Sequence, residues 1–190
     1  MKISAIVPVR RAEVLAPVAG QPALRRVVQA LSEAGLHSVV VAVAPPLASG
    51  VRLALADLCA TVLDVADEDA VPAAVEHVRA EGVSHVLVAD PRQVLVSPRV
   101  IERVVAALSG GAVRVVPIGP VTDTVKTVDA QGRILATVDR SELRTGQYPY
   151  GKAIDAPADA EVVTVEGDPD AILADLPADA ALIEALIACR

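Results

Sequence analysis

Val39-Val40-Val41-Ala42-Val43 is an unbroken apolar run, with no polar residue at alternate positions. A strand with one solvated face alternates apolar and polar residues, whereas an unbroken run is typical of a strand covered on both faces of a sheet. Comparable runs, rich in valine and isoleucine, recur at residues 3–9, 61–65, 86–88 and 113–116. The sequence therefore predicts a sheet with helices on both faces.

Helical patterns lie between these runs. The first carries an apolar stripe at i, i+3, i+4 and i+7, formed by Leu24, Val27, Val28 and Leu31. Gly35 is expected to end that helix, and Ser97 and Pro98 are expected to begin another, as its cap and in its first turn. Alternating strands and helices predict an α/β fold with a doubly wound, mostly parallel, Rossmann-like sheet. Ligands of such sheets bind beyond the carboxyl ends of the strands.

The pattern changes after Pro120. Residues 122–138 are rich in β-forming residues that alternate, and the turn Asp129-Ala130-Gln131-Gly132 divides them, which predicts a protruding β-hairpin arm. An isolated hairpin is unstable in water, so the arm is expected to pack on another surface. Beyond it we expect a turn-rich stretch at 146–159, a strand at 161–165 and a helix at about 177–188. No repeat or linker divides the chain, and residues 1–190 are expected to form a single domain.

The composition argues against several classes of function. Tyr148 and Tyr150 are the only aromatic residues, which opposes a base-stacking surface for nucleic acid. The net charge of −7 opposes binding to polyanions, so no nucleic-acid partner is expected. Cys59 and Cys189 are too few and too far apart for a disulfide framework or a zinc site. Cys59 is expected to be a small buried hydrophobe.

Membrane and secretion signals are not found in the sequence. No apolar run reaches the roughly 18 residues that a membrane span needs, so no membrane partner is expected. The N-terminal run is too short for a signal peptide, and Arg10 and Arg11 follow it instead of preceding it. These features predict a cytoplasmic protein.

Several motifs occur in one order along nearly the whole chain. The strongest is Pro120-Val121-Thr122-Asp123-Thr124-Val125-Lys126, which is followed by Asp139-Arg140 and Gln147-Tyr148-Pro149. Weaker matches are a strand that ends at Asp90, an opening at residues 7–8 and 17–24, and a closing segment at residues 165–167 and 172–185. Together these motifs resemble the 2-C-methyl-D-erythritol 4-phosphate cytidylyltransferase (IspD) family, which has a nucleotidyltransferase fold.

The resemblance implies a reaction in isoprenoid-precursor synthesis, in which CMP passes from CTP to a sugar phosphate and pyrophosphate is released. In that family a Gly-rich loop and two lysines hold the triphosphate, and an aspartate helps to hold Mg²⁺. A threonine and an arginine on the arm of a second subunit hold the sugar phosphate. By this resemblance Asp90 is a catalytic and Mg²⁺-binding residue, Arg140 is catalytic and substrate-binding, and Thr124 is substrate-binding. The implied partners are CTP, a sugar phosphate and a second copy of the chain in a homodimer.

The chain departs from the family where the chemistry is concentrated. The loop after Pro8 is short and has no glycine, and Arg10 and Arg11, which occupy it, are candidate substrate-binding residues. Glu13 and Leu173 stand at the two lysine positions. Because each lost electrostatic stabiliser typically costs about 10²–10³ in rate, we expect a degenerate member, a pseudoenzyme with weak or absent turnover. The alternative is a non-catalytic dimer that binds a ligand or a partner as a regulator.

Each candidate residue also has a plainer role. Asp90 can form a turn or cap a helix at the end of its strand. Thr124 can be an outward-facing strand residue, and Arg140 can pair with a neighbouring carboxylate on the surface. Arg10 and Arg11 can form a solvated surface pair.

Two more departures lie near the strand that ends at Asp90 and in the late Pro motif. Gln93 stands at a family arginine position, and Tyr148 stands at a threonine position. Tyr148 and Tyr150 are expected to serve in packing, against the arm of a partner subunit.

Overall fold

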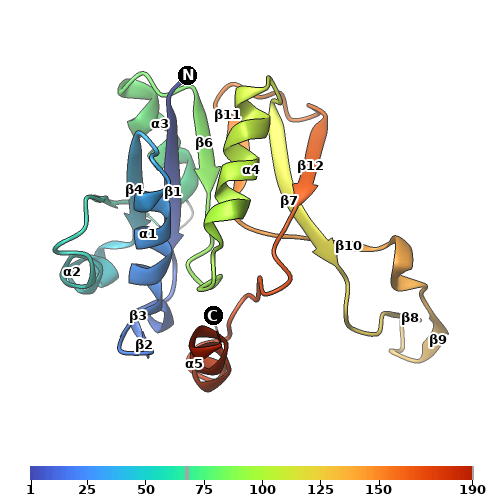
Figure 1. The fold of residues 1–190 in the computed structure, drawn as a ribbon. Coiled ribbons are helices and arrows are strands. Elements are labelled where there is room, and N and C mark those ends of the chain that lie inside the picture. Colours follow the sequence, from blue (N-terminus) through green and yellow to red (C-terminus); the bar gives the residue numbers. More distant parts are fainter. Residues whose placement is uncertain (67–68, 190) are drawn as a thin grey trace.

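The main sheet is built from the apolar runs of the sequence. The computed structural model describes residues 1–66 and 69–189, and within these residues the main sheet has eight strands. Six of them run in one direction and match the predicted strands (Figure 1): β1 (Ile3–Val9), β4 (Ser38–Val43), β5 (Thr61–Asp64), β6 (His85–Val88), β7 (Arg114–Pro120) and β12 (Val162–Glu166). The strand order β10-β7-β11-β6-β1-β4-β5, with β12 also on β7, confirms a mostly parallel, doubly wound sheet.

Helices cover both faces of this sheet. Alternate residues of β1 separate the two layers, because Val7 packs with α1 (Ala23–Glu33), α2 (Pro45–Ala54) and α4 (Pro98–Ser109), whereas Ile6 packs with α3 (Ala70–Ala80). The predicted stripe of α1 is fully buried against the sheet. The helix ends at Glu33, and Gly35 follows with the positive φ of 68° that glycine tolerates. Ser97 precedes α4 as predicted, but its side chain makes no capping hydrogen bond.

The predicted turn-rich stretch at 146–159 is the main error of the sequence analysis. It contains β11 (Tyr150–Ala153), which lies between β6 and β7 and runs antiparallel to both. The short strand β10 (Arg144–Gly146) precedes it and pairs with the carboxyl end of β7, and the Gln147 N–H between them donates to the Pro117 carbonyl at 2.8 Å. Residues 144–153 therefore form one interrupted strand beside β7, and the interruption hides the strand pattern.

The arm lies apart from the main sheet (Figure 1), as predicted. Its strands β8 (Lys126–Val128) and β9 (Ile134–Thr137) are shorter than the predicted segments and pair only with each other. The Asp129 carboxylate closes the turn by accepting hydrogen bonds from the N–H groups of Gln131 and Arg133, both at 2.9 Å. Every residue of both strands is exposed. The short helix η3 (Arg140–Glu142) leads back to the sheet.

The C-terminal segment contains one more strand of the main sheet and the last helix, which lies below the sheet in Figure 1. β12 (Val162–Glu166) runs parallel to β7, and α5 (Ala180–Ala188) begins three residues later than predicted. The helix packs on a small hairpin, β2 (Pro17–Val18) and β3 (Gln21–Pro22), which follows η1 (Ala12–Leu15).

Two expectations about exposure have different outcomes. Cys59 is exposed, so the prediction that it is buried is wrong: it lies in the connection between α2 and β5, outside the core clusters. Among the described residues, no helix combines the length and apolar character that crossing a bilayer requires.

Candidate active site

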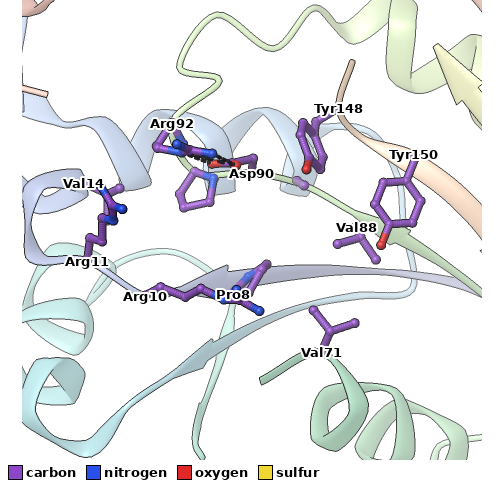
Figure 2. Close-up of a pocket in the computed structure, with 12 residues that line it drawn as sticks. Pro8, Arg10, Arg11, Val14, Val71, Val88, Asp90, Arg92, Tyr148 and Tyr150 are labelled. Atoms are coloured by element: carbon purple, nitrogen blue, oxygen red, sulfur yellow. Dashed lines mark hydrogen bonds and ion pairs between the residues drawn. The ribbon is translucent and has the colours of Figure 1, made fainter. Parts of the chain in front are cut away.

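A cavity of about 380 Å³ opens at the carboxyl ends of β1 and β6 (Figure 2). The chain continues from β1 to β4 on one side, and β6 lies on the other side, so the cavity sits at the point where the winding of the sheet reverses. Ligands of doubly wound sheets bind at this point. Of the candidate residues, the cavity brings together Asp90, Arg10 and Arg11.

Asp90 follows β6, and its carboxylate forms an ion pair with Arg92. The Arg92 backbone N–H donates to Asp90 Oδ1 at 2.9 Å, and the guanidinium donates to both carboxylate oxygens at 2.7–3.3 Å. This hydrogen bonding is the main reason why the pKa of Arg92 lies above its ordinary value. The Asp90 side chain is 15% exposed. The carboxylate therefore performs the turn-forming role and also holds an arginine inside the cavity.

The described residues do not by themselves build a metal site. They contain no group of three or more His, Cys, Asp and Glu side chains that could hold a metal ion. Within the described part of the chain, Asp90 is the only carboxylate that lines the cavity, and both of its oxygens already accept hydrogen bonds from Arg92. A Mg²⁺ ion here would need to displace that guanidinium and take most of its ligands from a substrate. The described residues thus do not by themselves fit a protein-held Mg²⁺, the ion that the resemblance implies.

Arg10 and Arg11 form the link between β1 and η1. Both are exposed, and Figure 2 shows them on one side of the cavity, across from Tyr148 and Tyr150. Glu13 lies further along, on η1, is exposed, and is not part of the cavity lining. The positive charge at the mouth of this cavity therefore comes from arginines that follow the first strand directly.

Two buried glutamines fix the loops around the cavity. Gln93, 2% exposed, donates to the Tyr148 carbonyl at 2.5 Å and accepts from the Tyr148 N–H at 3.0 Å. Gln147, 8% exposed, binds the carbonyl and the N–H of Asp168 in the same way, at 2.9 and 2.8 Å. Each side-chain amide replaces a neighbouring strand for one residue. Gln93 was noted in the sequence as a departure and Gln147 as part of a motif, but these hydrogen bonds were not predicted, because nothing in the sequence signals this pairing.

Tyr148 and Tyr150 line the cavity from β11 and the residues before it. Their ring centroids are 5.9 Å apart, with an angle of 49° between the planes. Tyr150 also packs against the core under α3, and this burial raises the pKa of its hydroxyl. Tyr150 therefore packs within its own chain, whereas the predicted packing against the arm of a partner subunit stays a prediction, and the position of both rings on the cavity wall was not predicted. Their uniqueness as aromatic residues was the signal that could have found them.

Arg140 and Thr124 lie elsewhere, on the approach to the arm. Arg140 donates to the Thr122 carbonyl and lines a second, shallow hollow together with Ser141 and Arg144. Its described hydrogen bond does not go to a neighbouring carboxylate, and Asp139 instead accepts from the Ser141 N–H at 2.9 Å. Thr124 is exposed and does not line this hollow. Within one chain the structure does not bring Arg140 or Thr124 together with Asp90.

Solved structures share this architecture over nearly the whole chain. A crystal structure of a 4-diphosphocytidyl-2C-methyl-D-erythritol synthase superposes with a TM-score of 0.82 at 21% identity, over 98% of both chains. The 2-C-methyl-D-erythritol 4-phosphate cytidylyltransferase from Thermus thermophilus gives a TM-score of 0.79 at 24% identity, over 99% of this chain and 100% of the other. At these identities the likeness shows the fold, which is that of a nucleotidyltransferase.

Sequence comparisons narrow that class to one family. The model of the family "IspD: 2-C-methyl-D-erythritol 4-phosphate cytidylyltransferase" matches residues 9–184. The 2-C-methyl-D-erythritol 4-phosphate cytidylyltransferase of Saccharopolyspora erythraea is 36% identical over 92% of this chain and 90% of its own length. The protein of the same name from Nocardia farcinica is 35% identical over 90% of this chain and 84% of its own length. The chain belongs to the IspD family.

Proposed function

We propose that this chain is an IspD-family cytidylyltransferase whose turnover is weak or absent, and that its cavity serves mainly to bind a ligand. The observation that carries this proposal is the connection after β1. Only Arg10 and Arg11 separate the end of β1 at Val9 from the start of η1 at Ala12. A link of this length without glycine has no row of successive N–H groups to wrap around a triphosphate.

The two lysine positions of the family support the same proposal. Glu13 puts a negative charge on η1, next to Val14 of the cavity lining, so at this position Coulomb repulsion of a triphosphate replaces the attraction of a lysine. Leu173 is 45% exposed, and the N–H of the next residue, Ala174, donates to the Arg92 carbonyl at 3.0 Å. A lysine at position 173 would therefore lie close to the Asp90 loop. Each lost cation costs about 2.7–4 kcal/mol of transition-state stabilisation when it acts alone, so two losses leave little rate advantage even if they add only in part.

The engagement of Asp90 is a third support. In the family an aspartate helps to hold Mg²⁺, which would offset charge on the transferred phosphate when bound. In this chain Arg92 neutralises the matching carboxylate. No step of the proposed function runs through a metal, and the cations available to a phosphate-bearing ligand are arginines.

A homodimer is the assembly that we propose, and it also supports the second candidate function. The arm exposes Val128, Ile134 and Leu135, by 55%, 67% and 67%. A hairpin of this size is not stable by itself, and an apolar surface of this kind gains from being covered. A second subunit would also carry Arg140 and Thr124 towards a neighbouring cavity. A dimer that binds a ligand or a partner without turnover, as a regulator, is therefore the alternative function.

A pyrophosphate-release assay with CTP, 2-C-methyl-D-erythritol 4-phosphate and Mg²⁺ tests the main proposal, with an active family member as positive control. We expect a turnover below about a tenth of the ordinary enzyme median of about 10 s⁻¹. Turnover at or above that level contradicts the proposal. A double variant, Glu13→Lys with Leu173→Lys, should gain at least about tenfold. Glu33→Lys, which makes the same change of charge as Glu13→Lys at an exposed position of α1, should gain nothing.

Light scattering at micromolar concentration tests the assembly. The expected mass is twice the chain mass of 19.5 kDa. Leu135→Asp should shift the protein towards the monomer, because it places a charge on the surface that the partner would cover. A wild-type protein that is monomeric throughout this range contradicts the dimer.

A further inference from the structure

The only two aromatic side chains of the 190-residue chain stand on the wall of one cavity. Cores of this size ordinarily use aromatic rings for bulk, but here valine, leucine, isoleucine and alanine fill both core layers. Tyr148 is half-buried and belongs to neither layer. Its position therefore cannot be explained by packing of the core alone.

The cavity wall is rigidly built around these rings. Gln93 holds the Tyr148 backbone through both its carbonyl and its N–H, at 2.5 and 3.0 Å. Tyr150 is fixed by β11, in register with Val88 of β6, whose side chain also lines the cavity. The backbone that carries both rings is thus held before any ligand arrives, which lowers the entropic cost of binding to them.

The opposite side of the same cavity carries positive charge. Arg11 reaches the lining from the end of β1, across from the two rings, whereas Arg92 is paired with Asp90 (Figure 2). Arginine is well suited to phosphate and carboxylate groups because its guanidinium donates two parallel hydrogen bonds. The volume of about 380 Å³ lies near the lower end of ordinary ligand pockets. It favours one small ligand over two substrates at once.

We propose that Tyr148 and Tyr150 are specificity-determining residues that contact a planar ring of one small anionic ligand, whose charged group lies towards Arg11. Gln93 is the positioning residue that sets Tyr148. Tyr148 is a departure from the family resemblance, which puts a threonine at this position. The inference rests on the proposed function, because it takes the cavity to be a binding site.

Tyrosine fluorescence gives a direct test, because the protein has no tryptophan and both of its tyrosines line this cavity. The probes are CMP, which has a ring and a phosphate, ribose 5-phosphate, which keeps the phosphate without the ring, and inorganic phosphate. CMP should change the emission and bind about tenfold or more tightly than ribose 5-phosphate, as stacking on aromatic rings typically provides. Equal affinities, or no binding of CMP at millimolar concentration, overturn the proposal.

Variants distinguish the contribution of the tyrosine rings to binding from that of the Arg11 charge. Their affinities are measured by calorimetry, because substituting a tyrosine removes part of the fluorescence signal. Tyr148→Leu and Tyr150→Leu should weaken CMP by about tenfold and leave ribose 5-phosphate unchanged, and Tyr148→Phe should keep CMP binding. Arg11→Gln should weaken both ligands, whereas Arg133→Gln on the arm should weaken neither. Leucine variants that bind CMP like wild type overturn the proposal. If they do not fold, the comparison of the two ligands on the wild-type protein still decides.

The result is distinguishable from that of the turnover assay. Fast pyrophosphate release would contradict the proposed function. The ring contact proposed for Tyr148 and Tyr150 would still hold if CMP binds through its ring. Equal binding of ligands with and without the ring would overturn only the proposed role of Tyr148 and Tyr150.

Discussion

The main sheet and the arm are both made of β-strands, but the strands of the sheet are buried and those of the arm are exposed. In β1, four side chains, those of Ala5, Ile6, Val7 and Val9, are 0% exposed under helices on both faces. In the arm every strand residue is exposed, and a turn built on Asp129 provides the local order. Burial stabilises the sheet, whereas the arm keeps its apolar side chains available for another surface.

The strongest test of this contrast is one substitution made in both regions. Ile6→Ala in β1 should lower the free energy of unfolding by about 2–5 kcal/mol, because it leaves a cavity between the sheet and α3. Ile134→Ala in β9 should change it by less than about 0.5 kcal/mol at the lower concentration, where the monomer is the main species. Urea unfolding followed by circular dichroism, at two protein concentrations, measures both.

Concentration then separates the two explanations for any effect in the arm. An Ile134→Ala loss that grows with concentration is expected if a second subunit covers the arm. A loss as large as that of Ile6→Ala at every concentration would show that the arm is packed within its own chain.

A smaller effect is expected at the joint between sheet and arm. A Cβ added at Gly167 would lie 2.1 Å from Gln147 Oε1 and 3.0 Å from the Ile118 carbonyl oxygen. Gly167→Ala should therefore push the amide away from Asp168 and cost about 1–3 kcal/mol. Gly146→Ala is the control, because its Cβ would meet only Val116 at an ordinary 3.5 Å. Equal losses in chemical denaturation would contradict the role of Gln147.

The hairpin of the body and the hairpin of the arm differ in backbone strain. Ala19, between β2 and β3, has a φ of 47°, a left-handed conformation that favours glycine. Ala19→Gly should raise the free energy of unfolding by up to about 1 kcal/mol, since strain relief exceeds the added entropy of the unfolded chain. Ala130→Gly in the arm turn should give no gain. Thermal unfolding of the two variants compares them, and a gain at Ala130 alone would reverse the expectation.

The smallest effect concerns the charge of the arm turn. Hydrogen bonds from the Arg133 N–H and guanidinium, and from the Gln131 N–H, lower the pKa of the Asp129 carboxyl below its ordinary value of about 3.9. A depressed pKa stabilises the folded turn above about pH 3.9, and this contribution disappears as the pH falls through the folded value. An NMR titration should find the lowered pKa and a parallel shift of the two amide protons. A carboxyl pKa at or above about 3.9 contradicts the turn.

The sequence predicted the parallel part of the fold because its signals are local. Unbroken runs such as residues 39–43, and the α1 stripe at Leu24, depend only on neighbours in the chain. The antiparallel strand β11 was missed because Tyr150–Ala153 contains glycine and lysine and has no apolar alternation. Its strand conformation comes from pairing with β6 and β7, which are distant in sequence.

The same distinction explains the site. Asp90 was a candidate by the family resemblance, and the structure puts it at the cavity beyond the carboxyl end of its strand, where ligands of doubly wound sheets bind. Its ion pair with Arg92 was not predicted, since only the turn geometry brings the guanidinium back onto the carboxylate. The position of β11 brings Tyr148 and Tyr150 to the cavity wall. Because this strand was not predicted, the place of the two tyrosines was not predicted either.

The position of β11 also has a consequence for the growing chain on the ribosome. All the sheet partners of β7 come later in the sequence, as β10, β11 and β12, and β6 gains its second neighbour only when β11 is made. At about 5–20 residues per second, the valine-rich edge of β6 stays open for a few seconds during synthesis. An open edge of this kind invites pairing with other nascent chains. Until Tyr150–Ala153 emerges from the ribosome, β6 and β7 therefore lack the strand that joins them in the finished sheet.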